Sequence, residues 1–295
     1  MAWIKGTRYN DDLEGTAADD IIEGFGGHDW IWGLGGNDSL YGGSGDDDLY
    51  GGAGDDDLYG GTGWDYLEGG TGNDHYFVDS RNDQVVERSG EGNDRVYTTL
   101  SFYRLGANVE EVVYDGYGDF DGIGNSLANR IHGGDGHDTL DGLAGNDSLY
   151  GYGGDDNLVG GTGGDGLSGG AGYDWLFGGS GIDTLTGGSG PDDFHFDTAL
   201  SASTNVDRIR DFEVGSDAIF LDRAIFRGIA ADGQLNPDAY VEGSRALDAE
   251  DRIVCDQARG RISYDPDGNG AAAQILFATV AAGTDLESVD FFAYG

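Results

Sequence analysis

The sequence predicts an all-β fold, a solenoid in which short strands coil into two facing sheets. Three observations predict it. A nine-residue unit that begins with glycine recurs eight times from Gly6 and eight times again from Gly124. The sixth residue of the unit is Asp in fifteen of these sixteen copies. The eighth residue is apolar in every copy, so apolar side chains recur at a fixed spacing along both arrays.

Each nine-residue unit predicts one turn and one short strand. Glycines at positions one, two and four permit positive φ and close approach of the backbone, as a tight turn requires. The last three residues alternate outward, inward and outward, which is typical of a minimal strand. Two units then make one coil of eighteen residues, and apolar side chains stack in two internal columns. In the first array the columns are Leu13, Ile31, Leu49 and Leu67, and Ile22, Leu40, Leu58 and Tyr76.

The composition excludes several classes of partner. The formal net charge is −41, so nucleic acid phosphates and anionic lipid surfaces would be repelled. Such acidity with 58 glycines is also typical of disorder, but 38% hydrophobic and 12% aromatic residues argue against it. Cys255 is the single cysteine, which excludes an intramolecular disulfide. No apolar run approaches the length of a membrane-spanning helix, so we expect no transmembrane segment.

The sixth-position carboxylates predict a bound cation. In a coiled chain they stack about 4.8 Å apart, where two bare carboxylates repel by about 3 kcal/mol at an effective dielectric constant of 20. A hard divalent cation between the coils reverses the sign of this interaction. Carboxylate and carbonyl oxygens in flexible geometry suit Ca²⁺, whereas Mg²⁺ demands stricter octahedral order. The sequence therefore predicts calcium as the cofactor.

The units resemble the hemolysin-type, or RTX, nonapeptide G-G-x-G-x-D-x-U-x over about half of the chain. This resemblance implies a parallel β-roll in which each ion lies between two turns that are one full coil apart, held by Asp carboxylates and loop carbonyls. The implied ligands are Asp11, Asp20, Asp29, Asp38, Asp47, Asp56, Asp65, Asp74, Asn129, Asp138, Asp147, Asp156, Asp165, Asp174, Asp183 and Asp192.

The number of ions follows from the pairing of units. Eight units per array, each paired with the unit two further on, give six sites per array and up to about twelve ions. The pattern departs from the family at the starts of the arrays. Tyr9 and Ala18 replace the fourth-position glycine, and Asn129 replaces Asp. We expect weak or empty sites there, and the alternative for any single Asp is a solvated turn residue.

Changes of motif divide the chain into four predicted parts. These are a first RTX array at 6–77, a β-rich spacer at 78–123, a second array at 124–195 and a β-rich cap at 196–295. The spacer and the cap resemble segments that accompany RTX blocks. A cap is also expected on physical grounds, because a terminal coil would otherwise expose its core and its strand edges.

Two features of the predicted cap suggest further roles. Residues 286–295, LESVDFFAYG, resemble the uncleaved C-terminal signal of type I-secreted proteins, and the alternative is an ordinary edge strand. The turn at 265–270 matches the first half of an EF-hand loop. Leu276 stands where that loop needs its bidentate Glu, so a hairpin turn is the favoured interpretation.

No catalytic motif accompanies the arrays, since neither H-E-x-x-H nor G-x-S-x-G occurs. We therefore expect a non-enzymatic, calcium-binding protein of a Gram-negative bacterium, exported through a type I exporter and folded by extracellular calcium. The alternatives are a carbohydrate-binding or adhesive matrix protein, and an accessory RTX module of a polysaccharide-modifying enzyme. For these, outward aromatic rings at rung spacing would stack on an extracellular polysaccharide, or else on one another. The rings in question are Trp30, Trp32, Tyr50 and Tyr66.

Overall fold

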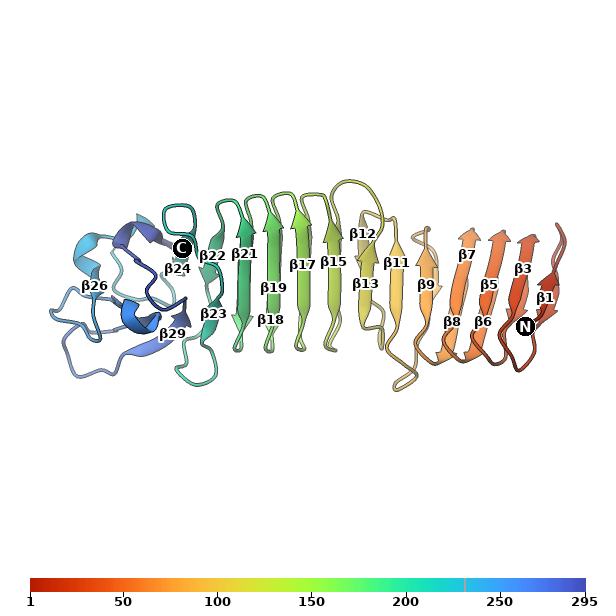
Figure 1. The fold of residues 1–295 in the computed structure, drawn as a ribbon, viewed down its shortest axis with the longest axis horizontal. Coiled ribbons are helices and arrows are strands. Elements are labelled where there is room, and N and C mark those ends of the chain that lie inside the picture. The colour runs from red at the N-terminus through yellow and green to blue at the C-terminus, as the bar shows by residue number, and fades with distance from the viewer. Residues whose placement is uncertain (231) are drawn as a thin grey trace. The chain divides into compact units, whose positions relative to one another are not determined.

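The computed structural model describes residues 1–230 and 232–295 and divides them into two compact units, Met1–Gly134 and Asp135–Gly295. Both units are built of short strands, shown in Figure 1 from red at the N-terminus to blue at the C-terminus. The helical elements of the described residues are three short 3-10 turns, η1 (Pro237–Ala239), η2 (Gln257–Arg259) and η3 (Ser288–Asp290). No helix in the described part of the chain has the length and apolar character needed to cross a bilayer.

The first unit coils its chain so that successive strands alternate between two facing sets of parallel strands. One set is a sheet that contains, in spatial order, β1 (Trp3–Lys5), β3 (Ile21–Gly26), β5 (Ser39–Ser44), β7 (Asp57–Thr62), β9 (His75–Val78), β11 (Arg95–Thr98), β13 (Glu111–Tyr114) and β15 (Arg130–Gly134). The facing strands are β2 (Asp12–Glu14), β4 (Trp30–Trp32), β6 (Asp48–Ala53), β8 (Tyr66–Thr71) and β10 (Gln84–Val85), and then the pair β12 (Phe102–Arg104) and β14 (Asp121–Ile123).

The core of the first unit consists of the two predicted apolar columns. Leu49 pairs with Leu67 and Leu40 with Leu58 in parallel register, so identical positions of the repeat lie directly above one another. The side chains of both columns are buried, and all except Leu13 have no exposed surface. The eighteen-residue coil and its internal stacking are thus confirmed.

The strands are longer than the sequence pattern predicts. In the regular repeats each strand covers six residues, as in β6, DLYGGA, rather than three. It continues through positions one to three of the next unit because the backbone pairing does not stop at the glycines. Gly52 pairs with Gly70 and Ala53 with Thr71 in the same ladder as Leu49 and Leu67.

The spacer residues form coils of irregular length whose strands β11 and β13 extend the first sheet. Arg95 of β11 pairs with His75 of β9 on one side and with Glu111 of β13 on the other. Glu111 in turn pairs with Arg130 of β15. No two of these three steps along the chain are equal, and none matches the coil of the array. The spacer therefore keeps the parallel pairing while losing the period. The predicted division into four parts marks changes of motif, and its boundaries stay predictions.

The second unit repeats the architecture and then departs from it. One sheet contains β17 (Ser148–Gly153), β19 (Gly166–Ala171), β21 (Thr184–Ser189), β23 (Asp207–Ile209), β29 (Ile275–Thr279), β28 (Arg261–Tyr264), β27 (Ile253–Asp256) and β26 (Tyr240–Glu242). The facing sheet contains β16 (Thr139–Asp141), β18 (Asn157–Thr162), β20 (Trp175–Ser180), β22 (Asp193–Phe196), β24 (Ala218–Asp222), β30 (Phe291–Tyr294) and β25 (Gly233–Gln234).

The C-terminal segment of the second unit continues both of its sheets before the order becomes antiparallel. β29 pairs in parallel with β23 and antiparallel with β28, so the turn at 265–270 lies in a hairpin loop. The last strand, β30, lies between β24 and β25, with Phe291 fully buried. Residues 291–294 therefore form an internal strand of the sheet rather than the edge strand considered for this segment.

Candidate metal centres

The sixth-position carboxylates form a hydrogen-bonded ladder along each edge of the coils. In most of them one oxygen, Oδ1, accepts the backbone N–H of the Asp one coil earlier. Asp56 accepts from Asp38 at 2.7 Å and Asp74 accepts from Asp56 at 2.8 Å. In the second unit Asp174 accepts from Asp156 at 2.9 Å. Because Oδ1 is held by the neighbouring coil, the direction of the second oxygen, Oδ2, is set by the backbone.

That second oxygen is buried and has no hydrogen-bond partner in most of the ladder. A buried carboxylate oxygen without a partner costs free energy unless a proton or a cation satisfies it. Eleven residues share this state: Asp29, Asp38, Asp47, Asp56, Asp65, Asp74, Asp156, Asp165, Asp174, Asp183 and Asp192.

The first-position glycines leave room beside these oxygens. An ideal Cβ on Gly42 would lie 2.5 Å from Oδ2 of Asp47 and 2.6 Å from the carbonyl oxygen of Gly60. In the second unit, a Cβ on Gly160 would lie 2.6 Å from Oδ2 of Asp165. A carboxylate oxygen and a carbonyl oxygen therefore face the same space, which a side chain would close. Converging hard oxygen donors of this kind fit Ca²⁺.

The pKa values of the ladder report the cost of leaving these carboxylates bare. Burial is the largest cause, and negatively charged neighbours on adjacent coils add to it. The pKa of Asp56 rises to about 8, and those of Asp65 and Asp192 rise to about 7. The pKa of Asp47 rises to about 6. A cation beside Oδ2 would favour the ionised form that burial disfavours.

The first two carboxylates of the first array are satisfied by the protein itself. Oδ2 of Asp20 accepts both the backbone N–H and the hydroxyl of Thr16, each at 2.7 Å. Oδ2 of Asp11 accepts the same two groups of Thr7, at 2.5 and 2.9 Å. Accordingly the pKa of Asp20 is lowered, chiefly by the backbone N–H of Ala2 and the hydroxyl of Thr16. Threonine at position two thus supplies the donors that mid-array carboxylates lack.

Asn129, at the start of the second array, also has its hydrogen bonds within the protein. Its Oδ1 accepts the backbone N–H of Asn125 at 2.7 Å, and its Nδ2 donates to the carbonyl of Val109 at 3.2 Å. The amide group of Asn129 can donate a hydrogen bond to a carbonyl oxygen. A carboxylate has no such donor, so it could lie beside the same carbonyl oxygen only if a cation bridged the two. The expectation that Asn129 is a weak metal ligand stays a prediction, and these bonds are its physical basis.

The ladder continues beyond the nonapeptides, through residues that the sequence pattern misses. Asp83 accepts from Asp65 at 3.3 Å and Asp94 accepts from Asp74 at 2.9 Å. In the second unit two cap residues extend it, Asp207 from Asp183 and Asp217 from Asp192, each at 3.1 Å. Asp83 follows Asp65 by one full coil and could have been found from the period. The other three follow at longer and unequal spacings, where insertions hide the register.

The outward aromatic rings contact one another along the rungs. The ring of Trp32 is stacked on that of Tyr50, with centroids 5.9 Å apart and planes 9° apart. The ring centroids of Tyr50 and Tyr66 are 5.6 Å apart, with the planes tilted by 43°. The indole N–H of Trp30 donates a hydrogen bond to the carboxylate of Asp48. On the other sheet Tyr41 is stacked on Tyr59 at 4.6 Å. Mutual stacking, the alternative to stacking on sugars, is thus seen for Trp32 with Tyr50, while sugar stacking by these rings stays a prediction.

Replacing one mid-ladder carboxylate should have opposite effects with and without calcium. Asp56 is shared by two implied sites, with Asp38 and with Asp74, and its amide variant Asp56→Asn keeps the Oδ1 hydrogen bond. We expect the calcium midpoint of folding to rise at least tenfold, about 1.4 kcal/mol. In chelator the variant should be no less stable than the parent, because a buried charge has been removed. Calcium titrations followed by circular dichroism measure both effects.

The matched control for this experiment is Asp55→Asn. Asp55 is exposed, and its Oδ1 accepts the backbone N–H of Asn73 at 2.8 Å, a bond that asparagine can also make. The change of charge is the same, and the residue is adjacent. Equal shifts of the calcium midpoint in the two variants would show that the effect is one of net charge rather than of ligation.

Comparison with known proteins supports the assignment of the arrays. The family described as RTX calcium-binding nonapeptide repeat (4 copies) matches residues 5–40, 41–76, 123–158, 132–167 and 159–194, about half of the chain. A search of curated proteins found no match. Among solved structures, the chain is similar to the solution structure of the AlgE6R3 subunit from the Azotobacter vinelandii mannuronan C5-epimerase. The identity is 25% over 57% of this chain and 80% of that chain, with a TM-score of 0.29.

The matched segments are the same two arrays whose Asp ladders and apolar columns the structure shows, and the predicted all-β solenoid is confirmed. The cofactor of these repeats is Ca²⁺, while the number of ions and the individual ligands stay predictions. The chain therefore belongs to the family of RTX calcium-binding nonapeptide-repeat proteins.

Proposed function

We propose that this protein is an extracellular RTX protein that folds when it binds calcium. The observation that carries the proposal is the row of buried carboxylates whose Oδ2 atoms have no partner. With a formal net charge of −41, the chain repels itself when the ladder is bare. Bound calcium would supply positive charge between the coils. At a concentration ten times its Kd, each ion stabilises the folded state by about 1.4 kcal/mol.

The proposed route places the unfolded chain inside the cell and the folded chain outside. Extracellular calcium modules bind with Kd values of about 10⁻⁴–10⁻³ M, so their sites fill only after export. Type I secretion from a Gram-negative cell fits this sequence of events. Phe291 of the C-terminal strand β30 is buried between β24 and β25 in the folded second unit. An exporter that recognises this segment would therefore have to do so in the unfolded chain.

A non-enzymatic role is part of the proposal. The buried carboxylates with raised pKa values lie in the repeating ladder, where the fold itself needs them as ligands. The glycan-binding alternative finds less support, because Trp32 and Tyr50 are stacked face to face and Tyr66 lies in tilted contact with Tyr50. Assays on polyuronates are expected to show no turnover.

A calcium titration of the chelated chain tests the proposal. We expect far-ultraviolet circular dichroism to change from a disordered to a β-sheet spectrum as calcium rises through the millimolar range, and EDTA to reverse the change. Magnesium at the same concentrations should have a much smaller effect, because Mg²⁺ demands strict octahedral order and gives up its water reluctantly. A chain that is equally sheet-rich after exhaustive dialysis against EDTA at neutral pH would contradict the proposal.

A further inference from the structure

The last coil of the first array lies against a residue that does not belong to the repeat. β10 pairs with β8 in the register of the repeat, with Gln84 opposite Tyr66 and Val85 opposite Leu67. In that register Glu87 follows Gly69 in the column of first-position glycines, Gly15, Gly33, Gly51 and Gly69. A glutamate therefore stands where the earlier coils have glycine.

The space beside Gly69 also differs from the space beside the earlier glycines. A Cβ on Gly51 would meet the carbonyl oxygen of Gly69 at 2.6 Å, whereas a Cβ on Gly69 would meet the hydroxyl of Tyr76 at 2.5 Å. That hydroxyl accepts the backbone N–H of Gly69 at 2.7 Å and donates to Oε1 of Glu87. Tyr76 occupies the eighth position, where the other units of the first array have Leu or Ile. Its hydroxyl thus orients Glu87 at the rim of the coil.

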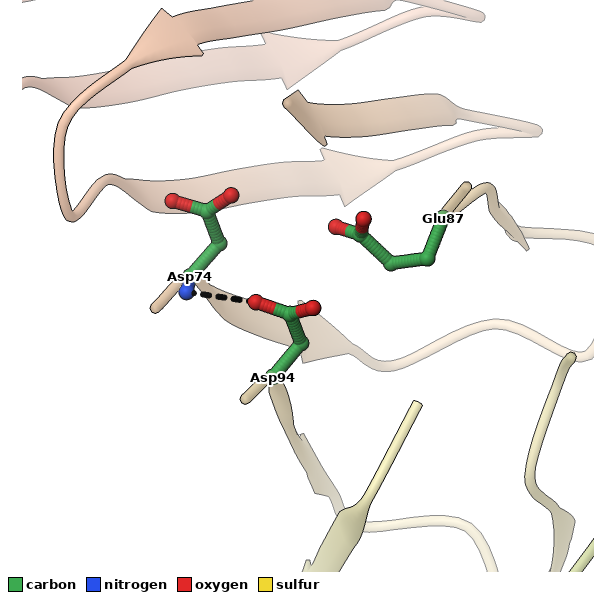
Figure 2. Close-up of side chains that lie close together, drawn as sticks. All are labelled: Asp74, Glu87 and Asp94. Carbon is green, nitrogen blue, oxygen red and sulfur yellow. Dashed lines mark hydrogen bonds between the residues drawn. The ribbon is translucent and has the colours of Figure 1, made fainter. Parts of the chain in front are cut away.

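Three carboxylates converge at this point. Oxygen atoms of Asp74, Glu87 and Asp94 all lie within 4.8 Å of one another, and the three side chains are 0%, 6% and 1% exposed. Figure 2 shows them on three successive segments, with the backbone N–H of Asp74 donating to Asp94. Oδ2 of Asp74 and Oε2 of Glu87 are buried without a hydrogen-bond partner. Two independent signs, convergence and unsatisfied oxygens, therefore point to a ligand.

The neighbouring basic residues pair elsewhere. Arg88 lies 2.6 Å from Glu68 and 3.4 Å from Glu91, and Arg95 lies 2.7 Å from Glu111. Among the described residues, no ion pair includes Asp74, Glu87 or Asp94. The charge of this cluster is thus left without a basic partner, and its donors are hard oxygens alone.

We propose that Asp74, Glu87 and Asp94 form a calcium site outside the nonapeptide scheme, in which the Glu87 side chain replaces a repeat carbonyl. The proposal rests on the proposed calcium-dependent function and deepens it. Three carboxylates bring one more negative charge than the two of an ordinary repeat pair, and charge count is a main determinant of calcium affinity. The site therefore binds its ion more tightly than the mid-array pairs do. It also fastens residues 79–94 to the last regular coil, where the period of the array ends.

The experiment compares three full-length chains by native mass spectrometry in saturating calcium, namely the parent, Glu87→Gln and Glu91→Gln. The amide oxygen introduced by Glu87→Gln can still accept from Tyr76, so the fold is retained while one ligand charge is lost. Glu91 lies outside the cluster in the same loop of the chain, and Glu91→Gln controls for the change in net charge. We expect the Glu87→Gln chain to hold one ion fewer than the parent, and the Glu91→Gln chain to hold the parent number.

A second measurement follows the fastened segment directly. Arg88 is largely exposed, so trypsin can reach it once residues 79–94 loosen. At limiting calcium we expect cleavage after Arg88 to be at least tenfold faster in Glu87→Gln than in the parent, which is the reference here because Glu91 itself contacts Arg88. An ion count and a cleavage rate of Glu87→Gln that both equal those of the parent would overturn the site, leaving Glu87 as a protonated partner of Tyr76. A parent chain that binds no ions at all would instead contradict the proposed function.

Discussion

In excess chelator, the chain is expected to gain β-sheet as the pH falls from about 8 to about 5. The reason lies in the ladder, where burial raises the pKa of Asp56 to about 8 and those of Asp65 and Asp192 to about 7. The usual value is 3.8, so the metal-free folded state binds more protons than the unfolded state. Its stability is therefore greatest at low pH and is lost progressively as the pH rises from about 4, the ordinary pKa, to about 8, the highest pKa of the folded ladder.

Saturating calcium should remove this dependence. The ligands are deprotonated when they hold the ion, and above about pH 5 the carboxyl groups of the unfolded chain are deprotonated as well, so the stability of the calcium-bound fold should change little over this range. Circular dichroism at fixed temperature, with EDTA in one series and calcium in the other, should give one curve that falls with rising pH and one that is nearly flat. Measurements should stay at about pH 5 or above, because the isoelectric point is near 4.1 and solubility falls there.

One outcome would contradict the predicted pH dependence of the chelated chain. Asp20, whose pKa is lowered by the hydrogen bonds from Ala2 and Thr16, contributes in the opposite direction, but it is one residue against a long ladder. If the chelated chain showed the same spectrum at about pH 5 and about pH 7.5, protonation would not replace the ion. The unsatisfied Oδ2 atoms would then not be what keeps the metal-free chain unfolded.

Alanine at one fourth-position glycine is expected to destabilise the calcium-bound fold by about 4 kcal/mol or more, a loss that is exceptional for a single substitution. Gly45 has φ of 130°, and an ideal Cβ there would overlap the carbonyl oxygen of Gly27 one coil earlier. Both residues are backbone positions that are hydrogen-bonded to the next coil, so neither can move aside easily. Gly45 donates to the carbonyl of Thr62 at 2.9 Å, and Gly27 donates to that of Ser44 at 2.9 Å.

The control separates crowding from backbone strain. Gly90 in the spacer also has a positive φ, 85°, but nothing lies within 4 Å of its ideal Cβ. Gly90→Ala should cost only about 1–2 kcal/mol, the ordinary penalty of a left-handed alanine. Urea unfolding in saturating calcium measures both variants. Similar losses at Gly45 and Gly90 would mean that the coils can separate enough to admit a side chain.

Sequence periodicity predicted the features that repeat. The positions of Leu49 and Leu67 in one column, their parallel register one coil apart and the sixth-position Asp ladder all follow from a spacing that can be counted along the chain. A regular period implies that one local solution is used many times, so it needs no knowledge of distant contacts. Asp83 could also have been predicted, since it follows Asp65 by one full coil of the repeat.

What the period could not reveal is how each array begins and ends. Thr16 donates two hydrogen bonds to the carboxylate of Asp20, and the turn geometry that allows this cannot be predicted from the repeat sequence. Asp207 and Asp217 join the ladder after loops of irregular length, so no count of residues brings them into register. Strand length was also underestimated, because the glycines of one unit pair with those of the next coil.

Glu87 illustrates the difference most clearly. From the chain it is a spacer residue among other acidic residues, while in space it faces Asp74 and Asp94, with Tyr76 holding its carboxylate in place. The Asp ladder and the apolar columns can thus be predicted from the amino-acid sequence, because every unit contacts a copy of itself at a known spacing along the chain. The chemistry at the ends of the arrays emerges from folding alone, because there each unit meets residues that are not its copies.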